Sequence, residues 1–427
     1  MKGLCVRDFF HFFLTSIYME TAYDDIKTIE DMIPGPPVKF SRDSRNFLIN
    51  FIDKCKRALL AVHSIQIQQL ESRTMMPNEP PTMTTLPTNY EHIPVNIRKS
   101  NFLEFAPKRH IHKATVIIKH RTYNFTIMQF ENASSALLTL EANHIIKQAC
   151  VWLLLASEYA PHECSNTVNV NLYLTHAKKV LPEKIREFVS EIHANTAFTT
   201  MCAKTTTINL YRKEEWFKVF IHETFHNLGM DFSSEQQMNT AANAEILRTF
   251  RINSEVRLYE TYCEMWAEII NLIIRNTSRH MRMLPENIIK HVEHDLQMER
   301  AFSLFQTAKL LHHFGIKYAD FLKPGINVRD KYKERTEVFS YFILKSIIMF
   351  DVNRFVEWCI VNNRNVVGFS NTETHILKYA RELILMQCNR PDFLRAIENI
   401  EETAFLPKKR IKKVHLMYRT MRMSFFG

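Results

Sequence analysis

Glycine is scarce in this chain of 427 residues, which contains only 7, scattered along its length. A loop that cradles phosphate groups needs several glycines within a few residues, so that backbone amides can approach the ligand. The sequence therefore excludes a P-loop and a Rossmann-type dinucleotide site. Few glycines also favour a largely helical chain, because glycine weakens helices.

Closely paired cysteines are lacking too. The eight cysteines form no C-x-x-C pair, and several lie in apolar runs, such as Cys150 in QACVWLLLA. We therefore expect no cysteine-based zinc site. We predict free, buried thiols in a reducing compartment.

Long hydrophobic runs are also missing. Outside the N-terminus the longest one, 149–156, is far too short to span a bilayer, so we expect no transmembrane segment. The apolar stretch near the N-terminus is interrupted by Arg7, Asp8 and His11, and no small-residue cleavage site follows it. It therefore does not predict a signal peptide.

The residues that are present fit a globular protein with a sizeable core, since 46% are hydrophobic and 23% are charged. Part of the net charge of +10 is concentrated near the C-terminus, in Lys408, Lys409, Arg410, Lys412, Lys413, Arg419 and Arg422. We predict that this basic tail is a helix that docks its Val414, Met417 and Met421 side on the body. The alternative is a weak contact with nucleic acid or an anionic membrane surface.

Hydrophobic periodicity predicts few strands and many helices. In the first half we expect a helix at 41–70, two strands around a turn near 120–122, a buried helix at 134–159, and strands at 168–175, 197–202 and 206–212. From Lys213 onward helices are predicted at 213–229, 236–250, 255–276, 285–314, 332–349, 351–362, 371–388 and 391–402.

These elements predict an α+β chain that is predominantly α. We divide it into an N-terminal extension with a helix and a proline-rich linker (1–96), a core with a small mixed sheet (97–280), and a helical C-terminal region with the basic tail (281–427).

A motif with recognisable chemistry lies in the run EEWFKVFIHETFHNLGMDFS (214–233), which contains His222-Glu223-x-x-His226. In a helix, two histidines four residues apart share a face and can hold one zinc ion, while the intervening glutamate acts as a general base on a water. The run follows a predicted strand, and Gly229 stands where the helix could end. The alternative is an amphipathic helix whose two histidines bind no metal.

A catalytic zinc site needs a third protein ligand. In the metzincin pattern it stands six residues after the second histidine, but Phe232 occupies that position and Asp231 comes one residue early. Glu260, Glu264 and Glu268 are spaced by four and so share one face of a predicted helix, where a cation would relieve their repulsion. A solvated face is the other interpretation of this stripe.

The run Glu264-Met265-Trp266-Ala267-Glu268 resembles the second helix of the gluzincins, which are HExxH metallopeptidases with a glutamate ligand. The resemblance implies a zincin-like core and these roles: zinc bound by His222, His226 and Glu264, Glu223 as the general base, and Glu268 as a carboxylate one turn further on, with Glu260 as the alternative ligand. The run HETFHNLGMDFS also resembles metalloproteases encoded by large DNA viruses. That resemblance implies a cytoplasmic or virion-associated peptidase.

Supporting groups can be proposed around this motif. Asp231 or Asn227 could bond the outer nitrogens of the histidines, as partners of metal-bound histidines do, and Asp231 is preferred. An oxyanion donor is also needed. We place Tyr341 and His313 first, ahead of the other candidates Arg257, Tyr262 and His312.

The substrate class is predicted from the strand TTINLYR, which ends at Arg212 just before the motif helix. An edge strand beside such a helix can pair with an extended chain through its backbone. We therefore predict a Zn²⁺-dependent metallopeptidase that hydrolyses peptide or protein substrates with a metal-activated water.

Two other functions stay open. One is an inactive zincin-fold protein with a structural or virion role, although a scaffold would not need Glu223 as a base. The other is a basic-tailed, nucleic-acid-associated protein with an incidental motif.

Overall fold

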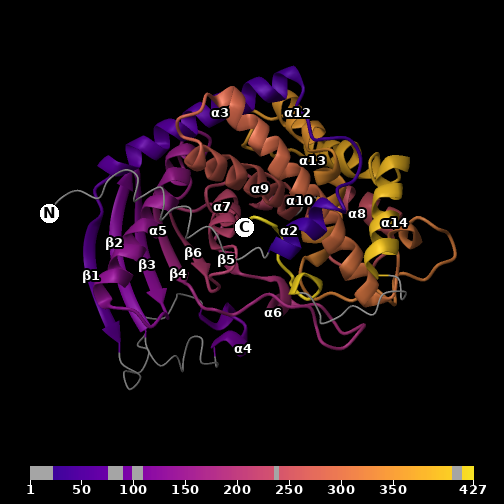
Figure 1. Ribbon diagram of the computed structural model, residues 1–427, viewed down its shortest axis with the longest axis horizontal. Coiled ribbons are helices and arrows are strands. Elements are labelled where there is room, and N and C mark those ends of the chain that lie inside the picture. Colours follow the sequence, from indigo (N-terminus) through magenta and orange to yellow (C-terminus); the bar gives the residue numbers. More distant parts are fainter. Residues whose placement is uncertain (1–22, 76–89, 99–108, 235–239, 406–415) are drawn as a thin grey trace.

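The computed structural model describes residues 23–75, 90–98, 109–234, 240–405 and 416–427. Within these ranges the chain is predominantly helical and contains one mixed six-stranded sheet (Figure 1). The predicted α+β class is therefore confirmed. No helix in the described ranges is long and apolar enough to cross a membrane.

The sheet has the strand order β1-β2-β3-β4-β6-β5. The strands are β1 (Gln68–Met75), β2 (Arg109–Ile118), β3 (Arg121–Gln129), β4 (Thr167–Tyr173), β5 (Ala197–Thr199) and β6 (Thr205–Leu210). β3, β4 and β6 run parallel to one another, whereas β1 with β2, β2 with β3, and β5 with β6 are antiparallel. The short antiparallel β5 therefore forms one edge.

The helices follow in chain order. Those before and within the sheet are α2 (Tyr23–Glu30), α3 (Arg42–Ala61), α4 (Val95–Arg98), α5 (Ser135–Ala156) and α6 (Glu191–Ala194). Those after the sheet are α7 (Trp216–Asn227), α8 (Thr240–Phe250), α9 (Leu258–Arg279), α10 (Pro285–Phe314), the π-helix η5 (Phe339–Leu344), α11 (Lys345–Phe350), α12 (Val352–Asn362), α13 (Glu373–Ala380), the π-helix η6 (Arg381–Leu385) and α14 (Pro391–Phe405).

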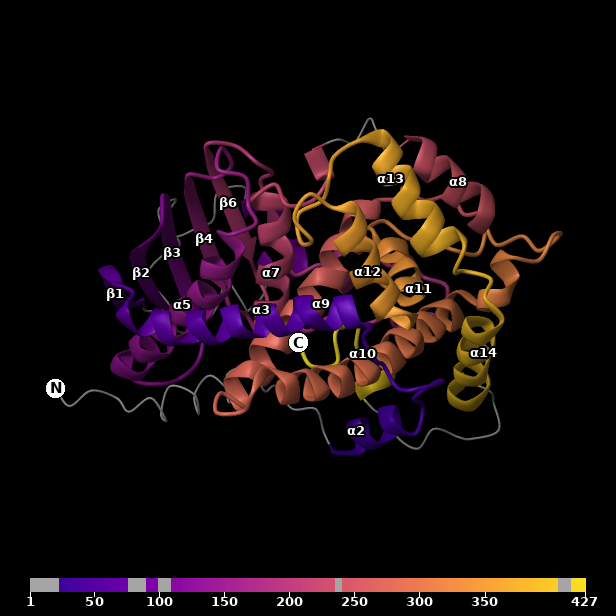
Figure 2. The same cartoon turned by 90° about the horizontal axis from the view of Figure 1, so that it is seen from above.

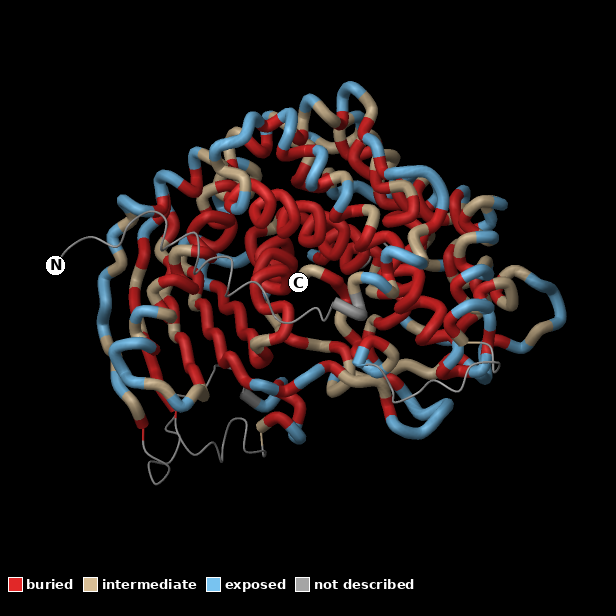
Figure 3. The backbone as a smooth tube through the Cα atoms, in the orientation of Figure 1, coloured by how far each residue is buried: buried red, intermediate tan, exposed pale blue. Residues whose placement is uncertain are grey.

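The helices α5 and α7 cover one face of the sheet, and α9 packs behind α7 (Figure 2). A small apolar cluster that includes Ile97 of α4 covers the other face. The helices α7 and α9 lie in the buried centre of the molecule (Figure 3). The structure thus places the motif helix between the sheet and the helical body.

One predicted helix is wrong in its last third. The helix predicted at 41–70 ends at Ala61, and residues 68–75 form the edge strand β1. The side chains of β1 are mostly exposed and polar, so they carry no apolar alternation. Such a strand is stabilised by backbone pairing with β2 rather than by a pattern that the sequence displays.

One continuous core contains residues from all three predicted segments, from Ile29 to Phe425. The basic tail lies mostly outside the described residues, which include neither the run 408–413 nor Val414. Met417 and Met421 are buried against the body as predicted, and the helical part of the described residues 416–427 is a 3₁₀ turn at Leu416–Tyr418.

The prediction of free thiols is wrong for Cys164 and Cys202, which form a disulfide. Cys164 precedes β4, and Cys202 lies in the turn between β5 and β6, so the bond joins two connections at one end of the sheet. The free, buried cysteines are Cys55, Cys150, Cys263, Cys359 and Cys388. Cys5 lies outside the described residues.

Candidate metal centre

The motif helix α7 is defined by its two ends. It begins after Glu215, whose φ of 58° places this residue in the left-handed region. It ends at Asn227, and Gly229, with a φ of +67°, follows two residues later. The amides of Gly229 and Met230 bond the carbonyls of His226 and Phe225. This is the glycine-terminated helix end that the sequence predicts. Every residue of α7 is buried, because the helix packs against β5 and β6 on one side and α9 on another.

The glutamate stripe of α9 faces α7 and not solvent. Glu260, Glu264 and Glu268 are only 7%, 2% and 0% exposed, so the interpretation of this stripe as a solvated face is wrong. All three carboxylates contact buried cationic or imidazole groups. The stripe is therefore part of the protein interior.

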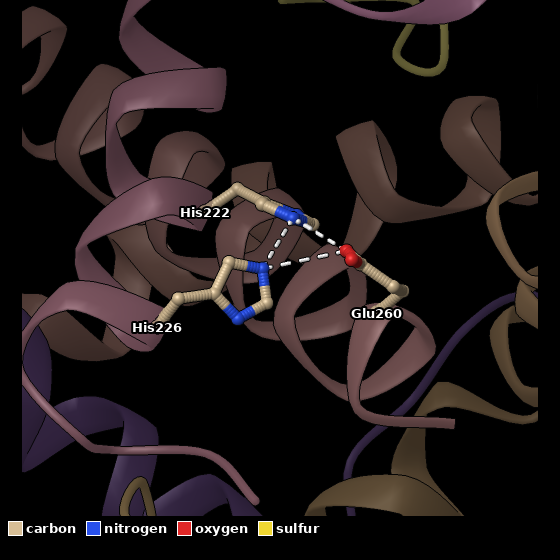
Figure 4. Close-up of side chains that lie close together, drawn as sticks. All are labelled: His222, His226 and Glu260. Carbon is tan, nitrogen blue, oxygen red and sulfur yellow. Dashed lines mark hydrogen bonds and ion pairs between the residues drawn. The ribbon is translucent and has the colours of Figure 1, made fainter. Parts of the chain in front are cut away.

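Three side chains bring one ligand atom each to a common point (Figure 4). Nε2 of His222 lies 3.0 Å from Oε2 of Glu260 and 3.1 Å from Nε2 of His226. Nε2 of His226 lies 3.4 Å from the same glutamate oxygen. These atoms are close enough together to hold a single metal ion.

Glu264 lies on the other side of the His222 ring. Its Oε1 is 2.9 Å from Nδ1 of His222, and its Oε2 accepts a hydrogen bond from Lys218. The structure therefore brings Glu260, and not Glu264, to the two Nε2 atoms. Glu268 lies one turn further on and contacts Lys345 at 2.8 Å.

The outer nitrogen of His226 contacts Asp231, the partner preferred from the sequence. Nδ1 of His226 and Oδ2 of Asp231 are 2.5 Å apart, and Cys263 lies beside both. These three groups also lie close enough to hold a metal. However, a histidine that binds a metal through Nε2 ordinarily uses Nδ1 to donate to such a carboxylate. The contact with Asp231 therefore fits an outer partner of a His226 that binds metal through Nε2.

Asn227, the alternative partner, is directed elsewhere. Its side chain bonds Thr199, Thr200 and Thr206 around β5 and β6. It fixes the end of α7 to the sheet and does not reach either histidine ring.

The charges in the cluster shift one another's pKa values. Burial alone would lower the pKa of His222, but the carboxylates of Glu260 and Glu264 outweigh it and raise this pKa. Burial would likewise raise the pKa of Glu260, but the two histidines outweigh it and lower this pKa. The cluster therefore favours a bound positive charge, whether protons or a metal ion.

Glu223 faces a cavity of about 400 Å³ beside the three ligand atoms. The cavity is lined by β5, by α7, by the start of α9 and by residues 335–337 and Tyr341. Burial raises the pKa of the Glu223 carboxyl, although both histidines act in the opposite direction. A carboxylate with a raised pKa is better suited to accept a proton near neutral pH.

Of the two preferred oxyanion donors, the structure brings only Tyr341 to this cavity. Its ring centroid lies 6.1 Å from that of His222. Burial, followed by the nearby carboxylates, raises the pKa of the Tyr341 phenol well above its usual value, so the phenol keeps its proton. His313 lies at the end of α10, where its Nε2 is 3.0 Å from the carbonyl oxygen of Glu187, and it does not line the cavity.

Of the three other candidate oxyanion donors, one lines the cavity and two do not. Arg257 lines the cavity and pairs with Glu337 at 2.7 Å. Tyr262 donates a hydrogen bond to the carbonyl of Val367 and lies in the core. His312 stacks on Phe405, away from the cavity.

The strand predicted to be the edge of the sheet is its next-to-last strand. The strand at 206–212 corresponds to β6, which lies between β4 and β5, so the edge is β5. The carbonyl of Thr196 accepts a bond from the Tyr211 amide just after β6. The Thr200 amide donates to the carbonyl of Thr207 in β6. The backbone groups of Ala197 and Thr199 consequently point away from β6, beside the cavity that these residues line.

Sequence reasoning missed Lys218 and Tyr259. Tyr259 lines the cavity, and its ring lies 5.7 Å from that of His226. Lys218 could have been found, because it lies one helical turn before His222 on the same face. A lysine in such an apolar helix predicts a buried anionic partner, here Glu264.

A second cavity, of about 660 Å³, lies between residues 33–39, Arg300 and the first turns of α12 and α14. It is larger, but none of the predicted site residues lines it. Its Arg390 already pairs with Asp351 and Asp392. The smaller cavity at α7 is therefore the candidate functional site.

Comparison with protein-family models, with curated proteins and with solved structures finds no match for this chain.

Proposed function

We propose that the protein is a zinc-dependent peptidase whose ligands are His222, His226 and Glu260. The observation that carries this proposal is the 3.0–3.4 Å spacing of the three ligand atoms. A tetrahedral zinc ion with bonds of about 2.0–2.1 Å separates its ligand atoms by about 3.3 Å. The donor set of two imidazoles and one carboxylate also leaves a fourth position for water, as a catalytic zinc site requires.

The proposal keeps the gluzincin donor set of two histidines and one glutamate, but the glutamate is the one that lies one helical turn earlier on α9. Glu260 takes the place of Glu264 as the ligand, and Glu264 becomes an outer carboxylate in ionic contact with Nδ1 of His222. Asp231 hydrogen-bonds Nδ1 of His226. Such outer carboxylates fix the tautomer of a histidine ligand and raise its basicity.

The reaction we propose is peptide hydrolysis. Zinc, when bound, supplies Lewis acidity that lowers the pKa of a water and polarises a carbonyl group. Glu223 accepts the proton of the attacking water and passes it to the leaving amine. Tyr341, which keeps its proton, donates a hydrogen bond to the oxyanion.

An extended peptide is the substrate that we favour. β5 is a free edge among the described strands, and the backbone groups of Ala197 and Thr199 adjoin the cavity. A chain paired with this edge would pass alongside Glu223 and the ligand atoms. Backbone pairing of this kind recognises the shape of a peptide more than its side chains.

The test combines metal analysis with peptide cleavage. We expect the purified protein to hold about one zinc per chain, and to cleave members of a complex peptide library detected by mass spectrometry. Glu223→Gln should keep the zinc and lose cleavage, because only the proton acceptor is removed. The control Glu214→Gln changes a nearby glutamate that accepts a bond from the Lys179 amide, and should remain active. A protein without zinc, or full activity in Glu223→Gln, would contradict the proposal.

A further inference from the structure

The segment Thr420–Phe426 near the end of the chain lies in a buried slot behind the candidate metal centre. Charged side chains, and not neighbouring strands, satisfy much of its backbone. The amides of Met423 and Ser424 bond Oε1 of Glu215 at 2.9 and 2.7 Å. The amides of Phe425 and Phe426 bond Glu299, at 2.8 Å for the closest contact of each.

Lys345 connects this segment to the candidate metal centre. Its Nζ donates to the carbonyl of Met423 at 2.6 Å and lies 2.8 Å from Oε2 of Glu268. The same Nζ lies 3.7 Å from Oε2 of Glu264, whose other oxygen is 2.9 Å from Nδ1 of His222. Two side chains therefore separate His222 from the backbone of Met423.

A second connection reaches the start of the motif helix. Glu215, which binds the amides of Met423 and Ser424, immediately precedes α7. The side chain of Met423 also lines a small cavity together with His222, Glu223 and Tyr341. The segment therefore contacts both the first turn of α7 and the back of the site.

The side chains in this slot form a nearly complete hydrogen-bonded network. The Ser424 hydroxyl lies 2.7 Å from Oε1 of Glu268 and 2.8 Å from Oε1 of Glu299. It has one proton and can donate to only one of them. Burial and the nearby Glu268 raise the pKa of Glu299 well above its usual value, so a proton on Glu299 can complete the second contact.

We propose that Lys345 and the segment Thr420–Phe426 are positioning elements of the metal centre, which hold Glu264 against Nδ1 of His222. This inference rests on the proposed function. Buried charges are costly to place in a protein interior, and removing one partner leaves the other uncompensated. Loss of the Lys345 ammonium leaves Glu268 without its cation. Glu264 is then left with Lys218 alone. The two carboxylates, one turn apart on α9, then repel each other, so Glu264 shifts away from Nδ1 of His222 and this ligand loses its orientation.

Lys309 provides a matched control. It is a second buried lysine, on α10, and it donates to the carbonyl of Thr420 at the start of the segment and to that of Met417 just before it. Among the described residues, Lys309 makes no hydrogen bond or ion pair with Glu264 or with either motif histidine. Removing its amine tests the general effect of loosening the segment, without the connection to His222.

The experiment measures zinc affinity by competition with a chromogenic chelator, in full-length wild type, Lys345→Met and Lys309→Met. Methionine keeps the length of the side chain and removes the amine. We expect Lys345→Met to bind zinc about 10- to 100-fold more weakly, the usual cost of losing a group that orients a ligand. Lys309→Met should stay within about twofold of wild type. The visible spectrum of the cobalt(II) form should change only in Lys345→Met.

Equal zinc affinity in Lys345→Met and wild type would overturn the inference while leaving the proposed function intact. Equal weakening in both lysine variants would also overturn it, because the effect would then be general. Absence of zinc from the wild type would instead contradict the proposed function and this inference together.

Ser424→Ala is the milder variant in case Lys345→Met does not fold. It removes one hydroxyl from the network, and we expect zinc affinity to fall by about threefold to tenfold. An unchanged affinity in this variant would contradict the positioning role.

Discussion

At the scale of single residues, two stripes with the same spacing face each other across the candidate centre. Lys218, His222 and His226 recur every four residues on α7, and the glutamates recur every four residues on α9. Because the contacts run from Lys218 with Glu264 to His226 with Glu260, the two helices are antiparallel. The register between the helices therefore decides which glutamate meets the Nε2 atoms.

This register yields a prediction about two glutamates. Glu260→Gln should abolish stoichiometric zinc, because it weakens a ligand, whereas Glu264→Gln should reduce zinc affinity only about 10- to 100-fold. Chelator competition with each purified variant measures the difference. The opposite order of the two variants would return the ligand role to Glu264.

The phenol of Tyr341 leads to a second prediction. Tyr341→Phe keeps the ring beside His222 and removes the donor, so kcat for peptide cleavage should fall about 10²- to 10³-fold. Zinc content and KM should change little. Steady-state kinetics on a cleaved library peptide supply both constants, and an unchanged kcat would remove Tyr341 from the mechanism.

At the scale of elements, the end of α7 is tightly constrained. Gly229 has a positive φ, and a Cβ placed on it would come within 2.8 Å of Sγ of Cys164 in the disulfide. A side chain here therefore combines backbone strain with a clash against a cross-linked partner. Gly35 has the same φ of +67°, but nothing lies within 4 Å of its added Cβ.

These two glycines form a matched pair for a stability experiment. Gly35→Ala should lower the free energy of unfolding by about 1 kcal/mol, the cost of left-handed backbone in a non-glycine residue. Gly229→Ala should lower it by about 2–4 kcal/mol, because overpacking adds to the strain. Urea unfolding of both variants under oxidising conditions measures the difference. Equal losses would show that the turn at Gly229 relaxes without cost.

The elements that the sequence predicted best are those with a strong local signal. The end of α7 was predicted from Gly229, and α10 was predicted with the bounds that the structure gives it. The disulfide could not be predicted, because its cysteines are 38 residues apart and have no spacing motif. The edge position of β5 was also missed, since neighbour order in a sheet depends on long-range pairing.

The same distinction applies to the site. His222, Glu223 and His226 share one helix, so their grouping follows from local geometry. The choice among Glu260 and its two neighbours depends on how α9 slides along α7. The position of α9 along α7 is set by buried contacts with residues such as Lys345, which is far from both helices in the sequence.

At the scale of the whole molecule, the centre joins parts of the chain that are far apart in sequence. The sheet supplies the edge β5, the helical body supplies α9, and residues 420–426 close the rear of the site. Residues 334–339 carry the far side of the cavity through Arg335, Thr336 and Glu337. Within this last segment, the partly buried carboxyl group of Glu334 binds the Tyr332 hydroxyl and the Phe339 amide.

Glu334 leads to a prediction about pH. Its Oε2 accepts bonds from the Tyr332 hydroxyl at 2.8 Å and from the Phe339 amide at 2.7 Å, and burial raises its pKa to about 8. The ordinary value is 4.5, so between pH 4.5 and about 8 the native state holds a proton that the unfolded chain releases. Unfolding is then accompanied by proton release, and the free energy of unfolding falls as pH rises through this window. The contribution is fully present below pH 4.5 and is lost above about pH 8.

Glu334→Gln removes this titration and keeps an oxygen acceptor for both donors. The variant should therefore lose less stability than wild type between pH 5 and pH 8, as measured by urea unfolding at several pH values in that interval. Glu373→Gln, an exposed change in the first turn of α13, should follow the wild-type curve. Parallel curves for wild type and Glu334→Gln would show that Glu334 is ionised throughout the window.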